Sequence, residues 1–102
     1  MQTFRMWVPS RKGRADLHFR SPTIKHTSVV HIAVSEAHNF AESFEPTRRI
    51  LSLFGAASIT LQNVSVRDGA VDFYVYVDWH SPLHLMCDIT VLDPPVEFIR
   101  GS

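Results

Sequence analysis

The residues of this chain best suited to acid–base chemistry are Asp78 and His84, which stand on either side of a short connection at 80–82. In an antiparallel pair closed at that connection they lie directly opposite each other, with Cβ atoms about 5 Å apart. A carboxylate at this distance can hydrogen-bond the imidazole, fix its tautomer and raise its basicity, as a general base requires. The pair is equally typical of an ordinary cross-strand contact at a surface, so catalysis by Asp78 and His84 is the alternative function and not the preferred one.

Polar and aromatic side chains share the predicted sheet face with this pair. We expect them to bind a ligand or to form an interface, because Tyr, Trp and Met are enriched in protein interfaces. These residues are Tyr74, Tyr76, His80, Met86 and Asp88, with the edge of Trp79 beside them. The imidazoles of His80 and His84 with Asp78 are also of the types that bind zinc, but their spacing around a proline-containing turn is not diagnostic. We therefore predict no metal and no cofactor.

The shared face follows from a register that the apolar pattern predicts. In 71–79 and again in 83–91 every odd position is apolar, which is the period of two of half-buried strands. If Trp79 faces Leu83 across the connection, the odd positions pair apolar with apolar along both strands. The even positions then form the polar and aromatic face, so the candidate site depends on this one register.

The strand before this pair is joined to it by a second turn. Asp68-Gly69 is a strong hairpin signal, because both residues tolerate a positive φ. Further back the alternation changes phase by one residue, which predicts a bulge at 62–63 facing Tyr74. We expect a three-stranded antiparallel meander with one continuous apolar face.

The remaining elements are expected to complete an α+β fold. Two strands at 3–8 and 15–20 predict an N-terminal hairpin, and 29–34 is apolar on nearly both faces, which is typical of a central strand covered on each side. A stripe at helical spacing over 37–54, with Ser35 as its cap and Pro46 inside it, predicts one kinked helix or two short helices. A short edge strand is expected at 96–99.

These elements predict a single antiparallel-rich sheet with helices packed on one face. A chain of 102 residues, 45% apolar and 20% charged, is expected to form one domain, 1–102. Within it we expect a basic hairpin segment at 1–28, a strand-helix-meander core at 29–99, and a tail at 100–102 in which Gly101-Ser102 resembles a cloning scar.

The single cysteine and the hydropathy pattern favour a cytoplasmic protein. Cys87 stands at an inward-facing position of its predicted strand, so we expect a small core residue and a reducing compartment. No apolar run approaches the roughly 20 residues of a membrane helix, and no signal-peptide pattern is seen, so neither export nor membrane insertion is expected.

The neutral net charge hides an uneven distribution. Residues 1–28 carry six cations and one carboxylate, so the rest of the chain is acidic by the same amount. We expect the basic segment to lie on an acidic surface of the same or a neighbouring subunit. Arg11, Lys12 and Arg14 can instead contact phosphate or nucleic acid, which is a third functional class, but the lack of an overall basic excess argues against it.

No motif in the chain specifies a reaction. The preferred function is a homo-oligomeric module, expected to be a dimer, that binds a small organic molecule or a protein partner through the face with Tyr74, Tyr76 and Met86. The alternative is an acid–base enzyme of the hydrolase or isomerase class that uses Asp78 and His84.

Overall fold

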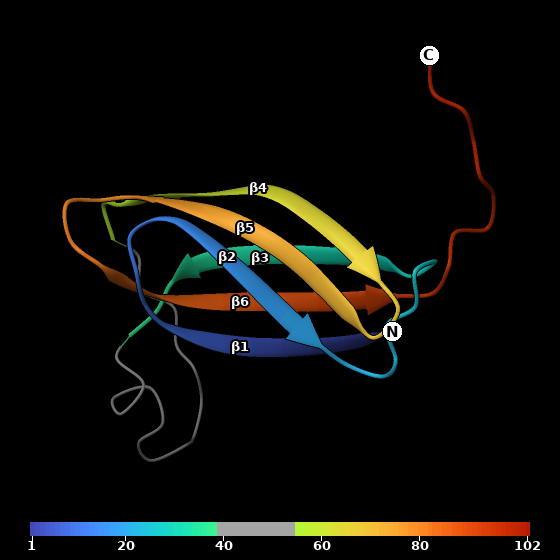
Figure 1. Cartoon of the computed structure of the whole chain (residues 1–102), viewed down its shortest axis with the longest axis horizontal. Coiled ribbons are helices and arrows are strands. Elements are labelled where there is room, and N and C mark those ends of the chain that lie inside the picture. The colour runs from blue at the N-terminus through green and yellow to red at the C-terminus, as the bar shows by residue number, and fades with distance from the viewer. Residues whose placement is uncertain (39–54) are drawn as a thin grey trace.

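Two three-stranded sheets, packed face to face, make up the part of the chain that the computed structural model describes, residues 1–38 and 55–102 (Figure 1). The strands are β1 (Gln2–Arg11), β2 (Gly13–Arg20), β3 (Val29–Glu36), β4 (Ser58–Arg67), β5 (Ala70–Asp78) and β6 (Leu83–Leu92). One sheet has the order β1-β6-β3 and the other β2-β5-β4, and all neighbours are antiparallel. The expected α+β fold is therefore wrong: the described residues form an all-β sandwich without a helix.

The register between β4 and β5 is confirmed, including its bulge. Val66 pairs with Val71 and Val64 with Phe73, and the register shifts after Leu61 so that Asn63 faces Tyr74. Gly69 has a φ of 83°, which the turn at the end of this hairpin requires. Turn chemistry and apolar alternation were sufficient here because the two strands are neighbours in both sequence and space.

The predicted pairing of β5 with β6 is wrong. β5 lies between β2 and β4, whereas β6 lies between β1 and β3 in the other sheet. The four residues between them include none that favours a positive φ, as a tight hairpin turn needs, and Pro82 has no amide hydrogen to donate. The connection instead carries the chain from one sheet to the other.

The predicted N-terminal hairpin is also wrong. β1 pairs with β6 and β2 pairs with β5, so the chain crosses between the sheets at Lys12 and at Gly13, whose φ is 67°. The register of β1 shifts between Val8 and Arg11, where Pro9 lacks a backbone donor. Each of the strands β5 and β6 is thus flanked by a strand from the N-terminal segment.

Three further predictions concern residues that the structure describes, and all three are wrong. β3 is an edge strand and not a central one. Ser35 lies within β3 and caps no helix, because the strand continues and the amide of Ala37 donates to the carbonyl of His84 at 2.8 Å. No strand forms at 96–99. The predicted helices, with Pro46, fall within 39–54 and so lie outside the described residues.

In each of the six strands one alternating set of apolar residues faces the space between the two sheets. The most deeply buried side chains are Ile24, Leu85, Ile89, Val71, Val75, Val77 and Cys87. The predicted burial of Cys87 is confirmed, and this burial raises the pKa of its thiol to about 12. Ile24 belongs to the loop after β2, which docks on the β4–β5 turn through a bond from the Gly69 amide to the Ile24 carbonyl at 2.7 Å.

Candidate functional site

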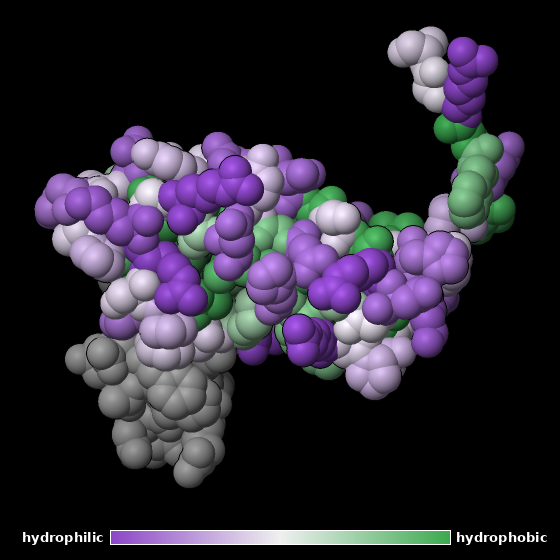
Figure 2. Space-filling model, viewed as in Figure 1, coloured by the Kyte–Doolittle hydropathy of each residue, from purple (hydrophilic) through white to green (hydrophobic). Residues whose placement is uncertain are grey.

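The outer face of the β2-β5-β4 sheet carries a grid of polar and aromatic side chains. It faces the viewer in Figure 1, and Figure 2 shows that hydrophilic residues cover most of it. The pairing of the three strands defines three cross-strand rows on this face: Arg14, Tyr76 and Thr60; Asp16, Tyr74 and Asn63; His18, Asp72 and Ser65. Alternation along β2 and β5 sends these residues outward because their neighbours are buried.

Arg14 and Tyr74 form a stacked pair on this face. The guanidinium carbon of Arg14 lies 3.9 Å from the centre of the Tyr74 ring, which is a cation–π contact. The Arg14 Nε donates to Oδ1 of Asp16 at 3.0 Å, and the two side chains keep 60% and 63% of their surface exposed. The guanidinium is thus oriented while it stays accessible to solvent.

Asp72 is held by two hydrogen-bonding partners, Arg67 on β4 and His18 on β2. The Nε of Arg67 donates to Oδ2 of Asp72 at 2.7 Å, and Nδ1 of His18 lies 2.6 Å from Oδ1. The hydrogen bonds from Arg67 and then from His18 lower the pKa of the Asp72 carboxyl to about 2. This carboxylate is therefore ionised at any physiological pH, and its position is tied to both flanking strands.

A hollow of about 320 Å³ lies over these rows. Its lining residues are Arg14, Asp16, His18, Asn63, Ser65, Asp72, Phe73 and Tyr74. The volume is at the lower end of the range of ligand pockets, ~300–1,000 Å³. The hollow combines hydrogen-bond donors, acceptors and one aromatic floor, so it suits a small polar molecule.

The predicted catalytic pair does not form. Asp78 lies in β5 opposite Ser58, whereas His84 lies in β6 in the other sheet. Trp79 and His80 occupy the connection between the sheets, with ring centres 4.5 Å apart, and Trp79 packs against the core. Among residues 1–38 and 55–102 no group of three or more His, Cys, Asp or Glu side chains is placed to hold a metal ion.

The predicted ligand and interface residues are divided between two faces. Tyr74 and Tyr76 lie on the outer face of β2-β5-β4, as described above. His84, Met86 and Asp88 lie on β6 in the other sheet. β6 pairs with β1 at these residues. Met86 is opposite Trp7, and the ring centres of Trp7 and His84 are 5.1 Å apart.

Arg11 and Arg5 of the basic N-terminal segment make their contacts within the molecule. Arg11 donates from Nη1 to the carbonyls of Pro9 and Ser10 at 2.8 and 3.1 Å, which closes its own loop. Arg5 pairs through Nε with Oδ1 of Asp88 at 2.7 Å. For this pair the expected contact with an acidic residue of the same subunit is confirmed.

Sequence reasoning missed most residues of the hollow. Asp16, His18, Asn63, Ser65 and Asp72 were not selected, although their outward direction follows from the same alternation. The missing signal was the pairing of β2 with β5, which are separated by about half of the chain. No local pattern reports such a pairing.

Comparisons with protein-family models, with curated proteins and with solved structures found no match for this chain. The function must therefore be argued from the geometry alone. Among the described residues, no helix is long and apolar enough to cross a membrane.

Proposed function

We propose that this protein is a binding module that takes a small, neutral, hydroxyl-rich organic molecule, such as a saccharide, in the hollow on the outer face of β2-β5-β4. The observation that carries the proposal is the pre-ordered set of donors and acceptors around Tyr74. Arg14 and Asp72 already have oriented partners, so they can bond a ligand with little loss of side-chain entropy.

The chemistry of the lining favours a neutral ligand over an ion. Arg14 is already paired with Asp16, and Asp72 is paired with Arg67, so these charges are balanced and favour neither an anion nor a cation as the ligand. Carboxylates accept hydrogen bonds from hydroxyl groups, and the guanidinium and the Asn63 amide donate to them. A small molecule fits the hollow better than a protein partner does, because Tyr74 is the one outward-facing aromatic residue of its lining, whereas Phe73 is 3% exposed and belongs to the core.

An NMR titration tests this proposal. Neutral saccharides and polyols, added to ¹⁵N-labelled protein, are expected to shift amide signals of β2, β5 and β4 and to leave β1 and β3 unchanged. Tyr74→Ala should weaken binding roughly tenfold, equal to about 1.4 kcal/mol. Tyr76→Ala is the matched control, since Tyr76 lies on the same strand and face but does not line the hollow. Equal effects of the two substitutions, or shifts spread over both sheets, would refute the assignment.

We propose that the module works in the cytoplasm. The one cysteine, Cys87, is buried and forms no disulfide, which supports a reducing compartment. We propose no turnover. Asp78 and His84, on which the enzyme alternative depended, belong to different sheets.

A further inference from the structure

The segment after β6 exposes a cluster of apolar side chains. Val96, Phe98 and Ile99 are 106%, 78% and 80% exposed. Figure 1 shows this segment leaving the sandwich, and Figure 2 shows its hydrophobic side chains standing away from the body. Apolar side chains gathered on a projecting segment mark a contact site rather than ordinary surface.

Two consecutive prolines direct the segment outward. Pro94 and Pro95 fix φ near −65°, and each restricts the residue before it to extended conformations. These restrictions disfavour a tight turn directly after Asp93, and in the structure the chain leaves the sandwich there (Figure 1). The apolar side chains beyond the prolines are more easily covered by another molecule.

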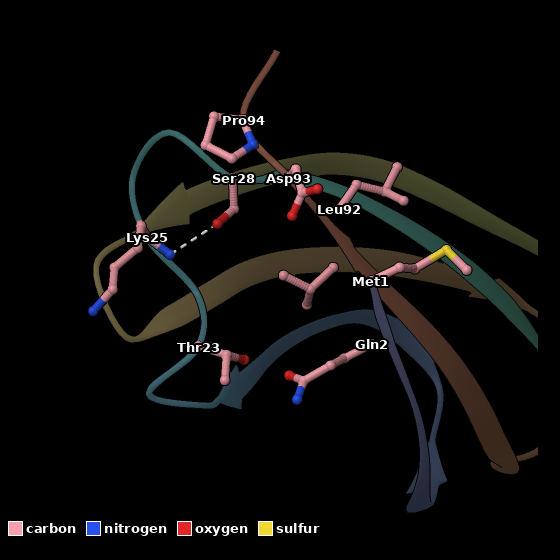
Figure 3. A pocket seen from close by; sticks show the side chains of 9 residues that line it. Met1, Gln2, Thr23, Lys25, Ser28, Leu92, Asp93 and Pro94 are labelled. Carbon is pink, nitrogen blue, oxygen red and sulfur yellow. Dashed lines mark hydrogen bonds between the residues drawn. The ribbon is translucent and has the colours of Figure 1, made fainter. Parts of the chain in front are cut away.

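A hollow of about 330 Å³ lies at the base of this segment (Figure 3). Its lining includes Met1, Lys25, Leu92, Asp93 and Pro94. Met1 is itself 84% exposed. Among the described residues, four of the five exposed large apolar side chains are thus either in this hollow or on the segment beside it, and Tyr76 is the fifth.

The charges of the segment and of the hollow are complementary. The hollow carries one cation, Lys25, and one carboxylate, Asp93. The segment carries Glu97 before Phe98 and Arg100 after Ile99. A segment laid in the hollow can therefore place a charge of each sign beside one of opposite sign, on the two sides of Phe98 and Ile99, which fixes orientation more than affinity.

We propose that the segment 96–100 of one molecule binds in this hollow of a second copy, and that the exchange is mutual in a twofold-symmetric dimer. A twofold arrangement suits this geometry, because Asp93 and Pro94, which precede the segment, also line the hollow. When the ends of two molecules that carry the hollow face each other, each segment has to extend only about 10–13 Å to enter the partner's hollow. Three to four residues in an extended conformation span this distance. The volume admits one or two side chains, and we assign Phe98 as the anchor because aromatic residues dominate such contacts.

Sedimentation velocity of the full chain over a range of concentrations tests the proposal. We expect a monomer–dimer equilibrium whose dissociation constant rises roughly tenfold or more in Phe98→Ser. Tyr76→Ser is the matched control, since it removes an exposed aromatic residue from a sheet face that the proposed dimer leaves free. A chain that is monomeric at all concentrations, or a dimer weakened by Tyr76→Ser and not by Phe98→Ser, would overturn the proposal.

A cross-linking experiment tests the exchange itself. Lys25→Cys and Glu97→Cys, made in separate chains and mixed under mild oxidation, are expected to give a disulfide-linked heterodimer, while the buried Cys87 stays unreacted. A chain with both substitutions should link between molecules and not within one. A bond formed within one chain would show that the segment covers its own hollow, which contradicts the exchange.

Discussion

The inner and outer faces of the β2-β5-β4 sheet are built by the same strands but from opposite kinds of residue. On β5, Val71 and Val75 are completely buried, whereas the neighbouring Asp72 and Tyr74 face outward among charged partners. Burying one aliphatic side chain contributes about 1.5–3 kcal/mol, whereas an exposed ion pair contributes about 0–1 kcal/mol. The interior therefore supplies the stability, and the outer face is free to serve recognition.

The largest expected effect comes from the interior. Ile89→Ala removes a fully buried side chain on the central strand β6 and leaves a cavity, so we expect the free energy of unfolding to fall by about 2–5 kcal/mol. The next residue, Thr90, faces outward, and Thr90→Ala should cost less than about 1 kcal/mol. Urea unfolding measures both, and similar losses would break the distinction between the two faces.

The turn between β4 and β5 comes next in size. Gly69 has a φ of 83° and no heavy atom near the position of a Cβ, so Gly69→Ala introduces backbone strain alone, about 1–2 kcal/mol. Gly101→Ala is the control, because that glycine has open space and no positive φ. Thermal unfolding of the two variants should separate them; equal midpoints would show that the turn relaxes.

A smaller effect is expected on the outer face. Asp72→Asn weakens the bonds to Arg67 and His18 and should destabilise the fold by about 1 kcal/mol near neutral pH. The folded-state pKa of Asp72, about 2, lies below its ordinary value of 3.8, so the stabilisation is present above 3.8 and is lost as the pH falls toward 2. Unfolding free energies of the two proteins, measured from neutral pH downward, should converge; a constant difference would assign the effect to another cause.

The smallest change in stability is expected for Arg14. Arg14→Gln removes the contact with Tyr74 and the ion pair with Asp16, both exposed, and should change the free energy of unfolding by about 0.5 kcal/mol. Binding of a saccharide should weaken in the same variant. Urea unfolding and the NMR titration measure the two effects. Nearly unchanged stability with weaker binding would support the division between a stabilising interior and a binding outer face, whereas a large loss of stability would contradict it.

Local patterns predicted the parts of the fold where sequence neighbours are also spatial neighbours. The β4–β5 register, with its bulge before Asn63, depends on a turn dipeptide and on side chains a few residues from it. The β5–β6 connection offered equally regular alternation on both sides but no turn residue with a positive φ, and there the prediction of a hairpin was wrong. The composition of the candidate site depends on the strand pairing. Tyr74 and Arg14 were selected from the sequence for separate reasons, and only the pairing of β2 with β5 brings them into contact.

What the sequence determined by itself is the direction in which each side chain points, inward at one parity and outward at the other. The positions predicted as apolar, from Val71 to Val91 along β5 and β6, are those that face the core. What only the tertiary structure decided is whether two successive strands lie side by side in one sheet or face to face in two. Both arrangements bury the same residues, so hydrophobic burial does not distinguish them; the choice depends on backbone partners that are distant in the sequence.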